Sequence, residues 1–339
     1  MQEARLWKPL RNGAAQCRLC NHFCAIPPGE RGKCGVRENR DGALYALNYG
    51  RIAALNLDPV EKKPLYHFQP GSRTYSFATM GCNFHCAFCQ NWTLSQPPGE
   101  DGRIEGRDAT PEQLVAEAVR LGAASISYTY SEPTIFFELM QDSARLAKAR
   151  GLKNIMVSNG FMSRECLDEL RDDIHAINVD LKCFTETFYA ELTGGRLAPV
   201  LENLKHIKHD LGWWLEVTTL LIPGKNDSPG ELDRLTDFLA KEVGTDTPWH
   251  ISRFHPDYKL TDRAATGRDS LEAAYAMGKS KGLKFVYIGN LPGTDRQQTL
   301  CPGCGELLID RTGFSASGSR VRDGRCLRCG EPIPGVGLG

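Results

Sequence analysis

Three cysteines lie close together in residues 82–89, and their spacing points most directly to chemistry. The segment reads Cys82-Asn83-Phe84-His85-Cys86-Ala87-Phe88-Cys89, a C-x3-C-x2-C pattern that follows an apolar run at 74–80. Soft thiolate ligands select iron–sulfur clusters or zinc. A cluster of four irons usually takes four cysteines, yet the next cysteine is Cys166. Three thiolates would leave one iron open, and an open metal position is where a reacting molecule binds.

The cysteine spacing, together with the aromatic Phe88 before Cys89, resembles the signature of the radical S-adenosylmethionine (SAM) superfamily. The resemblance implies a [4Fe–4S] cluster on the three cysteines, with SAM chelated to the open iron by its amino and carboxylate groups and Phe88 beside it. It also implies reductive cleavage of SAM to methionine and a 5′-deoxyadenosyl radical that abstracts hydrogen from a substrate. A zinc site that uses His85 as a ligand is the alternative.

Length and composition fit one large domain with appendages in a reducing cytoplasm. The chain has 339 residues, of which 41% are hydrophobic, enough for one large domain with appendages. Lys+Arg and Asp+Glu balance at 41 each, so no global charge favours nucleic acid or a membrane surface. No apolar run is long enough to span a bilayer, and the N-terminus has no visible signal peptide. The thirteen cysteines fall mostly into metal-type clusters, which favours a reducing compartment over disulfides.

Four more cysteines precede the central motif, in a segment punctuated by proline and glycine. They are Cys17, Cys20, Cys24 and Cys34, within 18 residues. Four thiolates can form a closed site that stabilises a loop too small to bury its own core. Structural zinc is the first choice and an auxiliary iron–sulfur cluster the second, because both take four sulfurs. His22 could replace one ligand.

The tail carries a second set of four, in two C-x2-C pairs with 21 residues between them: Cys301, Cys304, Cys326 and Cys329. Such pairs predict a zinc-ribbon or rubredoxin-like site with a closed shell of sulfurs. We expect structural zinc there, in a C-terminal domain at 291–339, and mononuclear iron is the alternative. The lone cysteine Cys166 is interpreted as a core residue. Cys183 follows Lys182 near the predicted active face, where a hydrogen-atom relay is the functional alternative and the absence of any role is the first choice.

Residues 1–73 are predicted as a separate cysteine-rich segment. Residues 43–57 predict a β-hairpin with its turn near Asn48–Gly50. Residues 58–65, Asp-Pro-Val-Glu-Lys-Lys-Pro-Leu, read as a connector whose charges face solvent.

Strand and helix patterns alternate through residues 74–290, which predicts an α/β domain of parallel strands with right-handed crossovers. The expected strands are 75–80, 125–130, 154–158, 176–181, 214–221, 250–254 and 285–288. The expected helices are 111–121, 134–150, 163–171, 200–208, 231–242 and 270–281. A closed barrel, a partial barrel or an open sheet fits this count. The family resemblance implies a partial (β/α)6 barrel of the TIM type.

Polar residues at the predicted strand ends are candidates for binding SAM, because function in barrels collects at the carboxyl ends of strands. Glu132, before Pro133, could accept hydrogen bonds from the ammonium group of an amino-acid ligand. The plain alternative is an acid favoured by the helix dipole. Ser158 and Asn159 precede Gly160, and this triplet could hold a carboxylate or ribose or simply form a turn.

Asp180 and Lys182 share one face of the fourth core strand with Asn178, because side chains alternate along a strand. Inward polar residues are costly unless paired or ligated, so they indicate either a SAM contact or an internal ion pair. Two histidines near the sixth strand are further candidates. His255 best matches the ribose-contacting histidine that the resemblance implies, and His250 is its rival.

Residues 74–290 resemble the pyruvate formate-lyase activating enzyme group, and the whole layout resembles the radical SAM enzyme of the AmmeMemoRadiSam system. The resemblance implies an oxidoreductase that receives electrons from a donor such as flavodoxin or ferredoxin and abstracts hydrogen from a partner protein, as a glycyl-radical activase does. Modification of a small molecule is the alternative reaction. A non-catalytic metal-binding scaffold for a partner or nucleic acid is the alternative from another class, and it leaves Asp180 and Lys182 unexplained.

Overall fold

A computed structural model describes residues 1–339. An eight-stranded sheet forms its centre, built from β8 (Ala54–Pro59), β9 (Arg73–Ala78), β11 (Ser125–Tyr128), β12 (Lys153–Ser158), β13 (Ala176–Asp180), β14 (Trp214–Leu221), β15 (Trp249–Arg253) and β16 (Val286–Gly289). The strands from β9 to β16 are parallel and lie in chain order, and β8 runs antiparallel to β9 at one edge. The edge strands β8 and β16 do not pair with each other, so the sheet is not a closed barrel.

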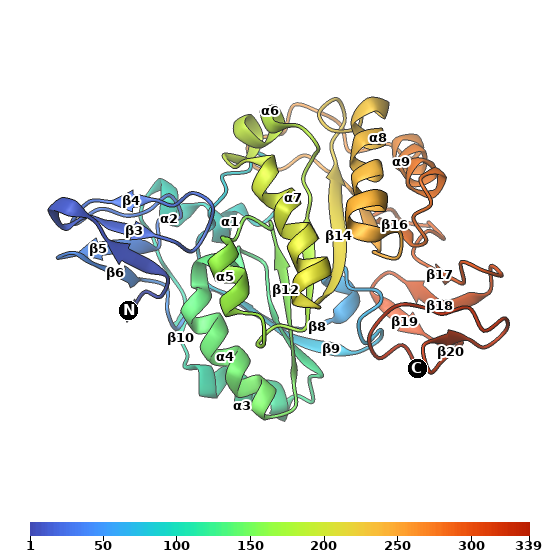
Figure 1. Ribbon diagram of the computed structural model, residues 1–339, viewed down its shortest axis with the longest axis horizontal. Coiled ribbons are helices and arrows are strands. Elements are labelled where there is room, and N and C mark those ends of the chain that lie inside the picture. The colour runs from blue at the N-terminus through green and yellow to red at the C-terminus, as the bar shows by residue number, and fades with distance from the viewer.

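A helix connects each parallel strand to the next, and the helices follow one another across the molecule in chain order (Figure 1). They are α3 (Pro111–Arg120), α4 (Phe137–Ala149), α5 (Arg164–Glu169), α7 (Leu197–His206), α8 (Pro229–Phe238) and α9 (Arg268–Ser280). Three shorter helices lie in loops: α1 (Trp92–Ser95), α2 (Pro97–Glu100) and α6 (Glu186–Phe188). None of the helices combines the length and apolar composition needed to cross a lipid bilayer.

The amino-acid sequence explains this arrangement locally. Thr110 caps α3 through a capping box with Gln113, and Pro111 occupies the first helical position. The strands are almost continuously buried, as expected for parallel strands covered on both faces. All seven predicted strands occur within two residues of their expected ends, and all six predicted helices are present. The α/β prediction is therefore confirmed.

The predicted hairpin at 43–57 is wrong. β6 (Ala43–Ala46) pairs instead with the preceding strand β5 (Arg37–Arg40), and the turn of that hairpin is at residues 41–42. The following residues belong to other sheets: β7 (Arg51–Ile52) pairs with β10 (Arg107–Asp108), and β8 joins the core sheet. Pairing with β9 along all six residues of β8 satisfies more backbone groups than a short local hairpin would. The core sheet consequently begins before residue 74.

The N-terminal residues form two small three-stranded sheets beside α4. One contains β1 (Gln2–Glu3), β6 and β5, and the other contains β2 (Trp7–Pro9), β3 (Ala15–Cys17) and β4 (Ala25–Ile26). A buried ion pair attaches them to the core: Arg37 Nη2 donates to both carboxylate oxygens of Glu138 in α4, at 2.8 and 2.7 Å. Arg5 adds hydrogen bonds to Gln141 and Asp142 of the same helix.

The C-terminal residues pack against the opposite end of the sheet (Figure 1). They contain β17 (Thr299–Leu300), β18 (Leu307–Thr312), β19 (Ser315–Ser317), β20 (Val321–Arg322) and β21 (Arg325–Cys326). Their small apolar core includes Tyr66, Phe285 and Tyr287 of the preceding chain. The buried Arg311 donates to the carbonyl of Tyr66 at 2.7 Å, and its guanidinium lies 4.2 Å from the centre of that ring.

His67 lies in this junction as a neutral, fully buried imidazole. Its Nδ1 lies 2.8 Å from the carbonyl of Pro334 and its Nε2 lies 2.6 Å from the hydroxyl of Tyr287. A carbonyl only accepts hydrogen bonds, so Nδ1 must donate and Nε2 accepts from Tyr287. Burial lowers the pKa of His67 to about 4, because desolvation disfavours the charged form.

We therefore expect acid to destabilise the fold through His67. The unfolded chain binds this proton near pH 6.5 and the folded chain only near pH 4, so stability is fully present above pH 6.5 and falls as the pH drops towards 4. Urea unfolding at pH 7 and pH 5 should differ by up to ~2 kcal/mol from this group. A His67→Asn variant should be less stable at pH 7 and show a shallower pH dependence. Replacing the exposed His209 with Gln should leave the slope unchanged, and an unaltered slope in His67→Asn would contradict this assignment.

Candidate functional site

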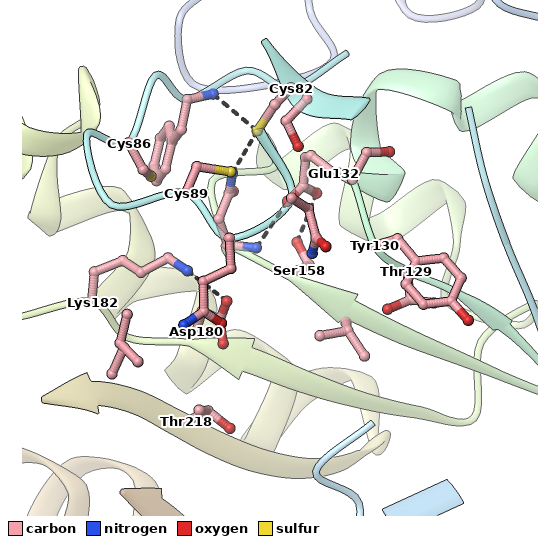
Figure 2. A pocket seen from close by; sticks show the side chains of 18 of the residues that line it. Cys82, Cys86, Cys89, Thr129, Tyr130, Glu132, Ser158, Asp180, Lys182 and Thr218 are labelled. Atoms are coloured by element: carbon pink, nitrogen blue, oxygen red, sulfur yellow. Dashed lines mark hydrogen bonds and ion pairs between the residues drawn. The ribbon is translucent and has the colours of Figure 1, made fainter. Parts of the chain in front are cut away.

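A cavity of about 470 Å³ opens at the carboxyl ends of the parallel strands. Figure 2 shows side chains from successive strands pointing into it. Nine of the residues selected from the sequence line it: Cys82, Cys86, Phe88, Cys89, Glu132, Ser158, Asn159, Asp180 and Lys182. Residues up to about a hundred positions apart therefore meet at one place, because parallel strands present their carboxyl ends at the same edge.

The three cysteines of the central motif occupy the loop that follows β9. Cys82 Sγ accepts a hydrogen bond from the backbone N–H of Phe84 at 3.3 Å. Burial raises the pKa of Cys86 to about 12 and that of Cys82 well above its usual value. Such thiols stay protonated in an apolar site unless a metal binds, because metal coordination deprotonates cysteine. No fourth cysteine lines the cavity, so the donor set fits a cluster with one open iron.

Glu132 connects the ends of two neighbouring strands. Its Oε1 accepts from Ser158 Oγ at 2.8 Å and from the backbone and hydroxyl of Thr134, and its Oε2 accepts from the backbone N–H of Asn159 at 2.9 Å. The residue is also the N-cap of a short 3-10 helix at Pro133–Phe136. Burial raises its pKa despite these donors. The carboxylate is thus held rigidly at the cavity wall.

Asn159 extends this network to the cysteine loop. Its Nδ2 donates to Asn83 Oδ1 at 2.7 Å and lies 4.0 Å from Cys82 Sγ. Gly160 follows in the left-handed region, and a Cβ there would come within 2.7 Å of Val179. Glycine is therefore required for this turn, and the turn aims Asn159 at the sulfur.

Asp180 and Lys182 form an ion pair inside the cavity. Lys182 Nζ donates to Asp180 Oδ2 at 2.5 Å, and both side chains are partly buried. Burial lowers the pKa of Lys182, but the negative charge of Asp180 and the hydrogen bond to it outweigh burial and raise the pKa. The third member of the predicted set, Asn178, donates to the carbonyl of Pro64 at 2.8 Å and does not line the cavity.

The two candidate histidines lie outside the cavity lining. His255 contacts Gln90 at 3.3 Å, and Gln90 lines the cavity, so His255 is at its rim. His250 is buried on the same face of β15 as the cavity-lining Ser252 but nearer the amino end of the strand, and it bonds Glu216 at 2.6 Å. Glu216 accepts in addition from Trp214 and from the backbones of Tyr66 and His67. Cys166 and Cys183 are both fully buried, which agrees with the core position predicted for Cys166.

The charges of residues 58–65 do not form a solvated face, and that interpretation is wrong. Asp58, Glu61 and Lys63 are all buried. Asp58 lies in the antiparallel edge strand β8 of the core sheet. It accepts hydrogen bonds from Lys63 at 2.6 Å and from Lys62 at 3.0 Å. Burial opposes the Asp58 carboxylate, but these donors and Tyr130 hold its pKa well below its usual value.

The sequence also gave no indication that Lys62, Lys63 and Tyr130 line the cavity. Tyr130 donates its hydroxyl to Asp58, and Lys63 Nζ lies 4.4 Å from the centre of its ring. Its φ of +65° is in the left-handed region, which is strained for a bulky residue. Figure 2 shows Tyr130 well separated from Cys86 and Cys89. Two lysines against one carboxylate give this part of the wall a net positive charge.

The four N-terminal cysteines line one small cavity next to the cysteine loop. Cys17 lies in β3, Cys34 lies just before β5, and Asn83 forms part of the same wall. Burial raises the pKa of Cys17 to about 11 and that of Cys34 above its usual value. His22 also lines this cavity, and its Nε2 lies 2.8 Å from the carbonyl oxygen of Asn83.

The C-terminal cysteines meet more tightly. The Sγ atoms of Cys301, Cys304, Cys326 and Cys329 all lie within 4.8 Å of one another, and the chain contains no other group of this kind. Cys301 and Cys329 are 3.5 Å apart, and Cys304 and Cys326 are 3.8 Å apart. Thiolates around a tetrahedral ion with Zn–S bonds of about 2.3 Å are ~3.8 Å apart. The residues therefore fit a single metal ion.

Comparisons with known proteins agree with this site. The sequence model of the Radical SAM superfamily matches residues 77–236. The uncharacterized protein MJ0808 of Methanocaldococcus jannaschii is 45% identical over 335 residues, which are 98% of this chain and 99% of that protein. The chain belongs to the radical SAM superfamily.

More distant relatives have different activities. The pyruvate formate-lyase-activating enzyme of Listeria monocytogenes is 24% identical over 185 residues, 50% of this chain and 70% of that protein. The GTP 3′,8-cyclase of Aquifex aeolicus is 26% identical over 192 residues, 51% of this chain and 57% of that protein. Among solved structures, Streptococcus suis SuiB bound to S-adenosylmethionine superposes with a TM-score of 0.51 at 14% identity, over 69% of this chain and 53% of that one. This last likeness shows the fold.

The buried pair of Asp58 and Lys63 should be essential to the cavity wall. Asp58→Asn leaves the Lys63 ammonium, whose pKa burial lowers to about 8, without its counter-charge. Removing one partner of a buried pair costs about 3–5 kcal/mol, which urea unfolding should detect. Asp262→Asn is the matched control, because Asp262 is exposed beside Arg263 and should change stability by less than ~0.5 kcal/mol. Equal effects of the two substitutions would contradict the assignment.

The C-terminal cysteines should bind about one zinc per chain. Cys326→Ser removes a buried ligand and should lose that metal, since a closed tetrahedral site needs all four sulfurs. Metal analysis of the purified protein checks this, with limited proteolysis to detect loosening of residues 299–339. The iron bound after reconstitution should stay unchanged in the variant. Retention of the zinc by Cys326→Ser would show that the metal is bound elsewhere.

Proposed function

We propose that this protein cleaves SAM reductively at a [4Fe–4S] cluster held by Cys82, Cys86 and Cys89 and uses the resulting radical to abstract hydrogen from a partner protein. The observation that carries the proposal is the convergence of three cysteines and the polar ends of four neighbouring strands on one cavity. The donor set suits both groups: thiolates for iron, and carboxylates, amides and an ammonium for an amino-acid nucleoside.

When bound, the cluster supplies the electron that breaks a carbon–sulfur bond of SAM and gives a 5′-deoxyadenosyl radical. The protein side chains bind and orient SAM for that step. Glu132 is a buried carboxylate whose orientation is fixed by Ser158, Thr134 and the backbone of Asn159. It can accept from the SAM ammonium through Oε2, which accepts one hydrogen bond from the protein, whereas Oε1 already accepts three.

Asn159 and the Asp180–Lys182 pair complete the proposed SAM site. The Asn159 amide lies against Cys82, where its N–H can stabilise a thiolate. Lys182 is placed to bind the SAM carboxylate, and Asp180 to accept from ribose hydroxyls. Phe88, which is buried in the cavity wall, excludes water from the cluster side. His255 reaches this region through Gln90 at the rim and is the histidine we propose for the ribose.

The substrate would approach from the wall formed by Lys62, Lys63 and Tyr130, and Tyr130 lies apart from Cys86 and Cys89 (Figure 2). The relative named pyruvate formate-lyase-activating enzyme supports a protein substrate. The relative named GTP 3′,8-cyclase supports a small molecule as the second candidate, and two lysines at the wall would suit an anionic one. In either reaction the electron comes from a donor of the flavodoxin or ferredoxin class.

The first test is anaerobic formation of 5′-deoxyadenosine from SAM, with dithionite as reductant. The wild type should form it, and the triple variant Cys82→Ala/Cys86→Ala/Cys89→Ala should lose the iron bound there and all product. Cys183→Ala is the matched control, because this buried thiol is next to Lys182 but outside the cavity lining, and it should keep the product. Product formed by the triple variant at the wild-type rate would end the proposal.

Glu132→Gln tests the proposed SAM contact. Losing a charge-assisted hydrogen bond of about 1.5–3 kcal/mol should weaken SAM binding roughly tenfold or more. Equilibrium binding of SAM to the reconstituted protein measures this, and the iron content should not change. Unaltered SAM affinity would remove Glu132 from the site. A glycyl radical detected by paramagnetic resonance in an added candidate partner would favour the protein substrate over the small molecule.

A further inference from the structure

We infer that Cys17, Cys20, Cys24 and Cys34 hold a second iron–sulfur cluster, which passes single electrons to the cluster at Cys82, rather than a structural zinc ion. Only the electron acceptor in this inference, the cluster at Cys82, rests on the proposed function. The metal class of the site is argued independently, from the geometry of the three cysteine sets and the walls of the N-terminal cavity.

The spacing of the sulfurs separates the three sets. The C-terminal cysteines gather within 4.8 Å, as one tetrahedral ion requires. The N-terminal cysteines form no such group, although all four line one cavity and none is in a disulfide. The cysteines of the central motif share this wider spacing. A cluster of four irons separates its thiolates around a larger body than one ion does. By this comparison the N-terminal set resembles the iron–sulfur set and not the C-terminal one.

The cavity walls suit a redox centre. Its lining combines the four cysteines with the apolar side chains of Leu19, Ile26 and Ile135. An apolar shell limits solvent access to a cluster and tunes its potential. Arg37 also lines the cavity and is buried, so a positive charge is present beside four thiolates. Because Arg37 is fixed by Glu138, the position of this charge does not depend on an exposed side chain.

The position of the site connects it to the central cluster. Asn83 is part of the N-terminal wall, and its chain neighbour Cys82 lines the central cavity. His22 contacts the Asn83 carbonyl, and Asn159 contacts the Asn83 side chain. Backbone hydrogen bonds from Asn21 to Phe161 and from Ser163 to Leu19 join the N-terminal cysteine segment to the loop that follows Asn159. The walls of the two sites therefore meet at two consecutive residues, Cys82 and Asn83.

The charge of the N-terminal segment indicates where electrons enter. Residues 1–40 contain eight Lys or Arg and three Asp or Glu, but Arg5, Arg18 and Arg37 pair with Asp142, Glu165 and Glu138 of the core. The five other cations exceed the three acids of the segment by two, and a basic surface attracts an acidic partner and accelerates its association. We propose a reduced flavodoxin as the donor class. It loses one electron, the N-terminal cluster gains that electron and passes it on, and the cluster at Cys82 ends reduced by one electron.

Iron and zinc analysis of the full chain, reconstituted anaerobically with iron and sulfide, tests the metal class. The wild type should contain about eight irons and about one zinc, the sum of two four-iron clusters and the C-terminal ion. Cys20→Ala/Cys24→Ala should lose about four irons. Cys166→Ala is the control, because this buried thiol lies near the N-terminal set but outside its cavity, and it should keep all eight. A wild type with about four irons and two zinc ions would overturn the inference.

The triple variant of the central cysteines gives a reading that does not depend on how the N-terminal variant folds. It leaves the N-terminal site intact and should keep about four irons. It should also give a paramagnetic resonance signal of a reduced iron–sulfur cluster on adding dithionite. Absence of both would overturn the inference. Failure of the wild type to form 5′-deoxyadenosine would instead count against the proposed function alone, since this test needs no SAM chemistry.

The relay is tested by following reduction of the cluster at Cys82 spectroscopically. With reduced flavodoxin as donor, Cys20→Ala/Cys24→Ala should reduce this cluster at least tenfold more slowly than the wild type. With dithionite, a small reductant that can reach the central cavity directly, the two proteins should be reduced at the same rate. Equal rates with flavodoxin would overturn the relay.

Discussion

The carboxylate of Glu132 is the interaction on which the candidate site depends. It is buried, and its donors come from the loop after β11 and the loop after β12. A buried carboxylate without donors would be very unfavourable, so the two loops must keep this geometry for the fold to form. Asn159 transmits the same constraint to Asn83 and thereby to the cysteine loop. The parallel sheet supplies the scaffold, and this network fixes the loops that the scaffold leaves free.

Buried charges also join the flanking segments to the core. Arg37 pairs with Glu138 on the N-terminal side, and Arg311 bonds the backbone and ring of Tyr66 on the C-terminal side. Glu216 of β14 accepts hydrogen bonds from the backbone N–H groups of Tyr66 and His67. Such pairs are weak evidence for stability, because desolvation offsets their attraction, but breaking one is costly. They therefore specify how the segments dock more than they strengthen the fold.

The three cysteine sets show how tertiary spacing distinguishes metal chemistry that spacing in sequence does not. The C-terminal set comes from two C-x2-C pairs whose four sulfurs lie within the range of one ion. The cysteines of the other two sets line one cavity each, and neither set gathers its sulfurs within 4.8 Å of one another. Two sets of four cysteines that look alike in the sequence thus present different sites.

The sequence by itself determined the α/β alternation, the seven parallel strands to within two residues of their ends, and nine of the 22 residues that line the cavity, because apolar periodicity and the C-x3-C-x2-C spacing are local signals. Asp180 and Lys182 were recognisable for the same reason, as polar positions on one face of an apolar strand. Only the tertiary structure decided the role of residues 58–65. Asp58 and Lys63 read as part of a solvated run, but β8 pairs with β9 and places Asp58 beside Tyr130, where Lys63 joins it. The same holds for His250, whose partner Glu216 lies on a neighbouring strand and is invisible to any local pattern. Burial and pairing are properties of the folded chain, so charged residues can be located from sequence but not assigned to solvent or core.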